Sequence, residues 1–238
     1  MCLQSARVDS LLSRSAISRC ETRTPADPIH FEVFQELLMK EGVNEGKPID
    51  EEWFRQHIAG RQNARICADL FPHWDAATAE KWSYDKEAAF REKAAGKLRA
   101  MSGLDEVMQI MDDLGLKKAA VTNAPRPNAE FMLNVIGKFD WFDTVIIGDE
   151  CPRAKPDPLP YTMAMGELGL EPHECIVVED SPSGAQAGVA SGAWTVGILT
   201  SQPADVLTSV GCQLLIQDYR DTRFRQVLKG EPAECAAP

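Results

Sequence analysis

Two adjacent carboxylates, Glu179 and Asp180, follow the short apolar run 176–178. Runs of this kind are typical of buried parallel strands, and open α/β sheets bind ligands at the carboxyl ends of such strands. Carboxylate oxygens at that edge suit a hard cation, so the pair predicts a Mg²⁺ site. The alternative is that the two acids only cap the helix that follows the Ser-Pro-Ser-Gly turn at 181–184.

Two further polar segments stand at the ends of apolar runs or in the loops that follow them. Thr122 and Asn123 come directly after the apolar residues 119–121, and Lys155 lies in a Pro-rich loop. Read singly, Thr122 predicts a turn cap and Lys155 a solvated loop lysine. Read together with the two acids, they predict that a hydroxyl, an ammonium and two carboxylates converge at one edge of a sheet.

These groups match the needs of phosphoryl transfer. The Thr122 hydroxyl and the backbone N–H of Asn123 are expected to donate to phosphate oxygens, and Lys155 to offset negative charge in the transition state. Asp180, supported by Glu179, is expected to place Mg²⁺ on the same oxygens. The predicted catalytic residues are therefore Thr122, Asn123 and Lys155, and the predicted metal ligands are Asp180 and Glu179.

The elements that would position these residues alternate along the second part of the chain. Strands are predicted at 119–121, 144–147, 175–178, 194–198 and 213–216, and helices at 103–114, 127–136, 160–169, 183–191 and 221–229. Strands that alternate with helices indicate right-handed βαβ units and a parallel sheet. By contrast, residues 26–102 read as helical, with Asp50 as an N-cap and an Ala-, Glu- and Lys-rich stretch at 76–100.

The bulk composition excludes several classes of protein. The 238 residues carry a formal net charge of −11, which disfavours nucleic-acid and anionic-membrane partners. No apolar run approaches the roughly 18 residues of a membrane span. Seven scattered cysteines without a C-x-x-C pair are typical of a reducing, cytoplasmic compartment rather than of a disulfide or zinc protein.

Residues 1–25 differ in composition from the rest of the chain. They hold five Ser and four Arg against two acids, which is typical of a plastid or mitochondrial transit peptide. A replaced N-terminal segment, such as an alternative start, explains the same composition. The apolar pieces in this segment are too short to predict a strand.

Three motifs resemble those of the haloacid dehalogenase (HAD) superfamily, in its sugar-phosphatase and β-phosphoglucomutase-like branch. VTNA at 121–124, AKPDP at 154–158 and VVEDSPSG at 177–184 look like its second, third and fourth motifs. The resemblance implies a Rossmann-like α/β core of parallel sheet flanked by helices, with an α-helical cap. It implies Mg²⁺-dependent hydrolysis of a small sugar or polyol phosphomonoester. Dehalogenation and phosphoglucomutase activity are less expected alternatives.

The same resemblance extends to the predicted cap. DPIH at 27–30 resembles the segment after the family's first motif, and HIAGR at 57–61 resembles the cap loop that reads the substrate. Arg61 and His30 would then face the substrate, a small phosphorylated metabolite. The expected division is an atypical segment at 1–25, a helical cap at 26–102 and the core at 103–238. The motifs do not indicate an oligomeric state.

The chain departs from the family at the first motif, Asp-x-Asp-Gly-Thr, whose two acids are the nucleophile and the general acid/base. An ungapped count from His30 puts these positions at Ser18 and Cys20, and no Asp-x-Asp-Gly occurs elsewhere. The hydrophobic strand expected before them, in the middle of the sheet, is missing as well. Residues 10–20 would fill the gap poorly, the flanking strands would pair, or the chain would fold badly.

Without those acids we expect impaired turnover, because a phosphoaspartyl mechanism needs a carboxylate nucleophile. Whether this chain is an enzyme is thus left open by its sequence. The alternative is a non-catalytic protein that binds phosphate or a sugar phosphate.

Overall fold

The computed structural model describes residues 15–18, 26–58, 61–135, 137, 139–200 and 202–231, with residues 15–18 and 26–27 described by their backbone only. The chain divides into two compact units, one at residues 24–99 and one that joins the N-terminal segment to residues 100–238. We call them the helical unit and the sheet unit. Within the described residues, no helix is long and apolar enough to span a membrane.

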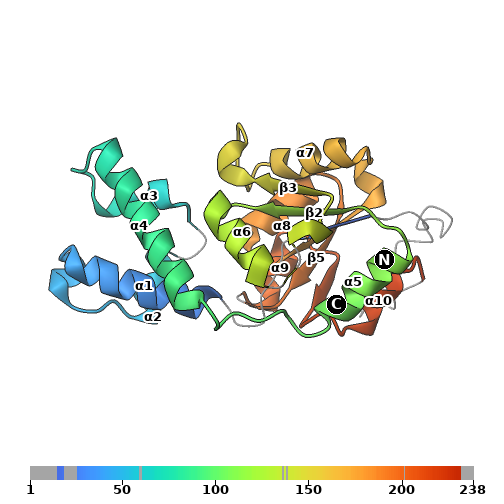
Figure 1. Ribbon diagram of the computed structural model, residues 1–238, viewed down its shortest axis with the longest axis horizontal. Helices are drawn as coiled ribbons and strands as arrows, with labels where there is room; N and C mark the ends of the chain where they lie inside the picture. The colour runs from blue at the N-terminus through green and yellow to red at the C-terminus, as the bar shows by residue number, and fades with distance from the viewer. Residues whose placement is uncertain are drawn as a thin grey trace. The chain divides into compact units, whose positions relative to one another are not determined.

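The sheet unit is built on six parallel strands in the order β3-β2-β1-β4-β5-β6 (Figure 1). Their bounds are β1 Ser15–Ser18, β2 Lys118–Thr122, β3 Thr144–Ile147, β4 Cys175–Glu179, β5 Trp194–Ile198 and β6 Leu214–Ile216. Five of them occupy the predicted strand positions to within a residue or two. The predicted fold class, a Rossmann-like parallel sheet flanked by helices, is confirmed.

The remaining strand, β1, corrects the sequence prediction. It lies between β2 and β4, with Ile17 in register with Ala119 on one side and with Val177 on the other. The segment that looked too short for a strand therefore fills the centre of the sheet, and the flanking strands do not pair with each other. A strand of four residues is long enough to hold this central position, because β2 and β4 both form backbone hydrogen bonds with it.

Residues on successive positions of each strand point to opposite faces of the sheet. On one face, Ile176 and Val178 of β4 pack with apolar residues of α5 (Leu104–Asp113) and α10 (Thr222–Leu228). On the other, Cys175 and Val177 pack against α7 (Leu159–Leu168) and α8 (Pro182–Ala190). Figure 1 shows α7 and the α5–α10 pair on opposite sides of the strands.

The remaining helices of this unit are α6 (Arg126–Val135) and α9 (Ala204–Ser209). The helices at 104–113, 126–135, 159–168, 182–190 and 222–228 match the predicted ones to within a residue or two. Helix α9 was not predicted, because it has six residues and is too short for a helical period to be recognised.

The helical unit contains α1 (Ala26–Lys40), a short η2 (Val43–Gly46), α2 (Glu51–His57), α3 (Asn63–Leu70) and α4 (Ala76–Ala94). Asp50 is the N-cap of α2, since its side chain accepts from the Trp53 N–H at 2.8 Å, as predicted. Helix α4 ends near Gly96, whose φ of +72° suits a glycine after a helix. Its aromatic core includes Phe34, Phe54 and Trp82.

The helical unit also buries an ion pair. Lys86 and Glu87 of α4 contact each other and are both almost fully buried. Asn63 donates to Glu87 at 2.7 Å, and the Lys86 ammonium lies 5.1 Å from the centre of the Phe34 ring. Burial lowers the pKa of Lys86 against the opposing effect of Glu87. Burial alone would raise the pKa of Glu87, but Lys86 and Asn63 outweigh it and the pKa is lowered.

Candidate functional site

The Lys155 side chain is buried at the carboxyl edge of the sheet, beside the ends of β2 and β4. Its ammonium donates to the backbone carbonyl of Val121 at 2.8 Å and forms an ion pair with Glu179. The peptide bond between Lys155 and Pro156 is cis. The structure thus brings the loop lysine onto the ends of two strands, and the alternative prediction of a solvated loop lysine is wrong.

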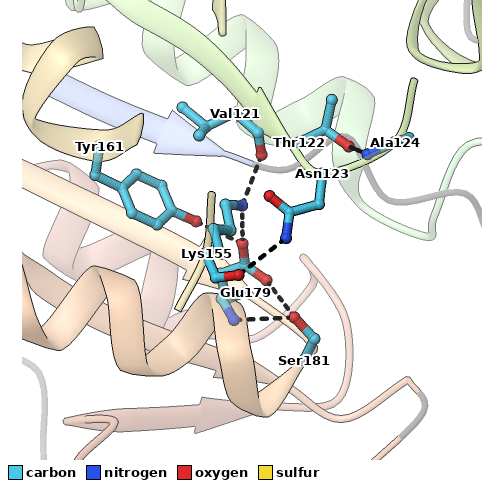
Figure 2. Close-up of polar contacts among 9 residues, drawn as sticks. Val121, Thr122, Asn123, Ala124, Lys155, Tyr161, Glu179 and Ser181 are labelled. Carbon is cyan, nitrogen blue, oxygen red and sulfur yellow. Dashed lines mark hydrogen bonds and ion pairs between the residues drawn. The ribbon is translucent and has the colours of Figure 1, made fainter. Parts of the chain in front are cut away.

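Glu179 is fully buried and ends β4 on the same face as Cys175 and Val177. Its oxygen Oε1 accepts from Lys155 and, at 2.5 Å, from the Tyr161 hydroxyl. Its oxygen Oε2 accepts from the Ser181 hydroxyl at 3.2 Å. Figure 2 shows these donors converging on one carboxylate, so Glu179 is the centre of a buried hydrogen-bond network.

The helix after β4 packs directly against this carboxylate. Ser181 is the N-cap of α8, and its hydroxyl accepts from the Gly184 N–H at 3.2 Å. The alternative prediction, that the two acids themselves cap this helix, is therefore wrong. A Cβ placed on Gly184 would lie 2.1 Å from Cδ of Glu179, so only glycine fits at this position without movement.

Thr122 and Asn123 lie where β2 ends. The Thr122 hydroxyl oxygen accepts from the backbone N–H of Ala124 at 3.0 Å, so its own proton can be donated elsewhere. The Asn123 amide donates to the backbone carbonyl of Lys155 at 3.3 Å, which links the two loops. Its Oδ1 is buried with no partner among the described residues, and it lies 2.3 Å from where a Cβ on Gly148 would stand.

Asp180 follows the strand and is only partly buried. Its Oδ2 accepts from the Thr200 hydroxyl at 3.3 Å. Mg²⁺ in proteins is commonly held by one or two carboxylates, with water and substrate phosphate as further ligands. Asp180 fits such a role, whereas both oxygens of Glu179 already accept from protein donors. No group of three or more metal-ligating side chains occurs in the described part of the chain.

The negative charge of Glu179 contributes to the raised pKa of a cysteine thiol, Cys212. Burial, followed by the charge of Glu179, raises the pKa of Cys212 to about 11. Burial also raises the pKa of Cys175 on β4 to about 11, with a smaller effect of Glu174. Both thiols are therefore protonated near neutral pH and are poor nucleophiles.

The two predicted substrate-reading residues lie in the helical unit. The Arg61 guanidinium donates to Asp69 at 3.2 Å and to the backbone carbonyl of Gln56 at 3.0 Å. His30 stacks on Phe90 with ring centres 4.0 Å apart. The structure does not place them relative to the site at the sheet edge, so their contact with a substrate stays a prediction.

The sequence does not predict the hydrogen bonds of Tyr161 and Ser181, nor the close packing at Gly148 and Gly184. A tyrosine inside an apolar helix reads as a core residue, and its hydroxyl gives no signal in the spacing. The glycines gain their meaning only from the side chains packed against them. No pattern in the sequence could have identified these contacts without the fold.

Comparisons with known proteins agree with the motifs. A family model described as haloacid dehalogenase-like hydrolase matches residues 21–192. The chain is 34% identical over 201 residues to a validoxylamine A 7′-phosphate phosphatase of Streptomyces hygroscopicus subsp. limoneus, covering 82% of this chain and 89% of the relative. It is 25% identical to an N-acetylmuramic acid 6-phosphate phosphatase of Pseudomonas aeruginosa, covering 73% of this chain and 78% of the relative.

Solved structures show the same fold. A HAD hydrolase of Entamoeba histolytica superposes with a TM-score of 0.80 at 20% identity, covering 91% of this chain and 98% of its own. A β-phosphoglucomutase of Clostridium difficile superposes with a TM-score of 0.76 at 18% identity, covering 91% of this chain and 96% of its own. The branch predicted from the motifs is therefore the one in which similar proteins are found.

Proposed function

Because the chain belongs to the haloacid dehalogenase-like hydrolase family, we propose that it handles a small phosphomonoester, a sugar or polyol phosphate, at the carboxyl edge of its sheet. The observation that carries the proposal is the Lys155 ammonium, buried between Val121 and Glu179 beside the Thr122–Asn123 loop. The names of the phosphatases similar to this chain support the substrate class.

In this proposal each residue acts on the phosphate in a different way. The Thr122 hydroxyl and the Asn123 backbone N–H donate to its oxygens, and Lys155 offsets its negative charge. Asp180 would hold Mg²⁺, which supplies further neutralisation of the phosphate when bound. Glu179 keeps the Lys155 ammonium in place, rather than serving as a second metal ligand. Arg61 and His30 would contact the remainder of the substrate.

The proposed activity is hydrolysis that is slowed by the residues at the first-motif positions. An in-line attack on the phosphorus needs an activated nucleophile, and the ungapped count puts Ser18 at that position. Cys20, at the acid/base position, lies outside the described residues. A second proposal follows from the same positions, namely that the protein binds a sugar phosphate without turning it over.

An aryl phosphate assay with Mg²⁺, combined with calorimetric titration of inorganic phosphate, tests both proposals. The variants are Asp180→Asn and the double variant Lys155→Met/Glu179→Gln, which avoids leaving Glu179 charged and buried without its cation. Lys229→Met, which removes an exposed lysine of the same unit, is the control. Melting curves establish that each variant folds.

Hydrolysis that is lost in both site variants and kept in Lys229→Met supports the enzyme. Phosphate binding without turnover, weakened in the double variant, supports the binding protein instead. If binding and hydrolysis are both indifferent to the site variants, the site does not handle phosphate and both proposals fail.

A further inference from the structure

Tyr161 is a fully buried tyrosine that the proposed roles do not use. It lies on α7, and its hydroxyl donates to the same oxygen of Glu179 that accepts from Lys155. Its ring centre lies 4.7 Å from the Lys155 ammonium nitrogen. Figure 2 shows the ring beside the lysine and the hydroxyl directed at the carboxylate. One side chain therefore contacts both members of the buried ion pair.

Core packing alone does not account for this residue. The ring packs in the apolar cluster that α7 forms with β4, which includes Met165 and Val177. A phenylalanine would fill the same space, and it would not bring a hydroxyl that needs a partner when buried. The hydroxyl is thus explained by what it binds, which is Glu179.

We propose that Tyr161 is a positioning residue for the Lys155–Glu179 pair. Its hydroxyl fixes the Glu179 carboxylate, and its ring and Glu179 together hold the Lys155 ammonium at the Val121 carbonyl, where it can offset the charge of a phosphate. The role of the ammonium toward phosphate rests on the proposed function. The positioning of the pair does not, and it is measured separately below.

The physical basis is the number of donors to a buried carboxylate. Removal of the Tyr161 hydroxyl takes one donor from Oε1, the oxygen of Glu179 that binds Lys155. A satisfied buried network is rigid, so a carboxylate that has lost a donor holds the ammonium less firmly. The face of an aromatic ring also attracts an ammonium group, which adds to the hold on Lys155.

Groups from several neighbouring segments interact with Glu179 by hydrogen bonds or by charge. Lys155 precedes α7, Tyr161 lies on α7, Ser181 caps α8, and Cys212 follows α9. Asp180 is the next residue along the chain. Of these, Lys155 carries the positive charge, and the Cys212 thiol stays neutral well above neutral pH.

The test compares Tyr161→Phe with Tyr219→Phe. Tyr219 is equally buried but belongs to the cluster on the opposite face of the sheet, beside Phe224. Each protein is labelled with ¹⁵N-lysine, and the Lys155 ammonium signal is recorded by NMR. That signal is assigned by its absence from Lys155→Met/Glu179→Gln. Affinity for inorganic phosphate is measured at neutral pH on the same samples.

In Tyr161→Phe we expect the Lys155 signal to shift and broaden, because the ammonium exchanges protons with water more readily. Phosphate affinity should fall on the order of tenfold, the effect of weakening one charge-assisted contact. Tyr219→Phe should leave both readouts unchanged.

A Lys155 signal that is the same in Tyr161→Phe and in wild type would overturn the inference, whatever happens to phosphate. Equal changes in both tyrosine variants would also overturn it, because a general loss of core packing would then explain them. A wild-type protein that binds no inorganic phosphate would overturn the proposed function instead. The ammonium signal would still decide whether Tyr161 positions the pair.

Discussion

Gly184 shows how tightly single residues constrain the site. Because a Cβ at this position would lie 2.1 Å from Cδ of Glu179, we expect Gly184→Ala to displace the carboxylate from Lys155. Overpacking of this kind costs about 1–3 kcal/mol. The expected result is a lower melting temperature together with weaker phosphate binding, measured by calorimetry.

Gly166 on α7 provides the matched control. It is also a helical glycine, but a Cβ there would meet nothing within 4 Å. Gly166→Ala should raise stability by roughly 0.5–1 kcal/mol, because alanine favours helix. If the two substitutions have the same effect, the close contact at Gly184 does not matter.

A second prediction at the scale of residues concerns the first-motif positions. The double variant Ser18→Asp/Cys20→Asp should gain Mg²⁺-dependent hydrolysis of an aryl phosphate, because it restores a carboxylate nucleophile and a general acid/base. General acid/base catalysis alone contributes about 10²–10⁴-fold. Ser18→Asn/Cys20→Asn has nearly the same shape without the acids, and it should gain no activity. An equal gain in both would place the chemistry elsewhere.

The chemistry of the site could be predicted from the sequence in part. The sequence predicts four of the site residues, because each follows an apolar run or belongs to a motif: Thr122, Asn123, Lys155 and Glu179. In the structure, Lys155 contacts both Asn123 and Glu179 at the carboxyl edge of the sheet. The sequence predicts both Asp180 and Glu179 as metal ligands, but the oxygens of Glu179 accept from protein donors, so Asp180 alone stays a proposed ligand. Tyr161 was missed because it is fixed by tertiary packing.

Helix α4 carries the next prediction. Lys86→Met would leave Glu87 buried and charged without its cation, which typically costs about 3–5 kcal/mol. Urea unfolding should show this loss, and Lys86→Met/Glu87→Gln should recover much of it. Lys81→Met removes the exposed i,i+4 partner of Asp85 on the same helix. That control should change stability by less than about 1 kcal/mol.

The same pair predicts a dependence on pH. In wild type the pKa of Glu87 is lowered, so its stabilisation is present above the unfolded pKa and lost as pH falls through the folded pKa. Without Lys86, burial instead raises the pKa of Glu87, and stability is gained as pH falls toward it. The difference in unfolding free energy between wild type and Lys86→Met should therefore narrow between pH 7 and about pH 4. A constant difference would mean that Glu87 does not titrate there.

At the scale of elements, long periodic segments were predictable and short ones were not. The strands at β2 to β6 were recognised because apolar or β-branched runs end in turn residues. The central strand β1 was missed because its sequence, Ser-Ala-Ile-Ser, has one large apolar residue. Its strand character comes from the ladders on both sides, a tertiary effect that overrides local propensity.

For the whole molecule, the test is whether β1 is needed. Deletion of residues 1–12 leaves β1 in the chain, whereas deletion of residues 1–25 removes it from the middle of the sheet. Each ladder hydrogen bond contributes about 1 kcal/mol, against a net stability of roughly 5–15 kcal/mol for a domain. We expect the shorter deletion to melt cooperatively in circular dichroism and the longer one to lose its cooperative transition.

If both truncated proteins melt like wild type, β1 contributes little and the sheet closes without it. If only the longer truncation fails, a processing event after residue 25 would remove part of the fold. The transit-peptide interpretation of residues 1–25 would then have to place its cleavage before Ser15.

The position of β1 in the chain also matters during synthesis on the ribosome. Among the described strands β1 emerges before the others, and its partners begin only at Lys118 and Cys175. Until then residues 15–18 have neither of the partners that make them a strand, while the helical unit, complete by residue 99, is free to fold. A chaperone that shields this segment would keep it available until β2 and β4 have been synthesised.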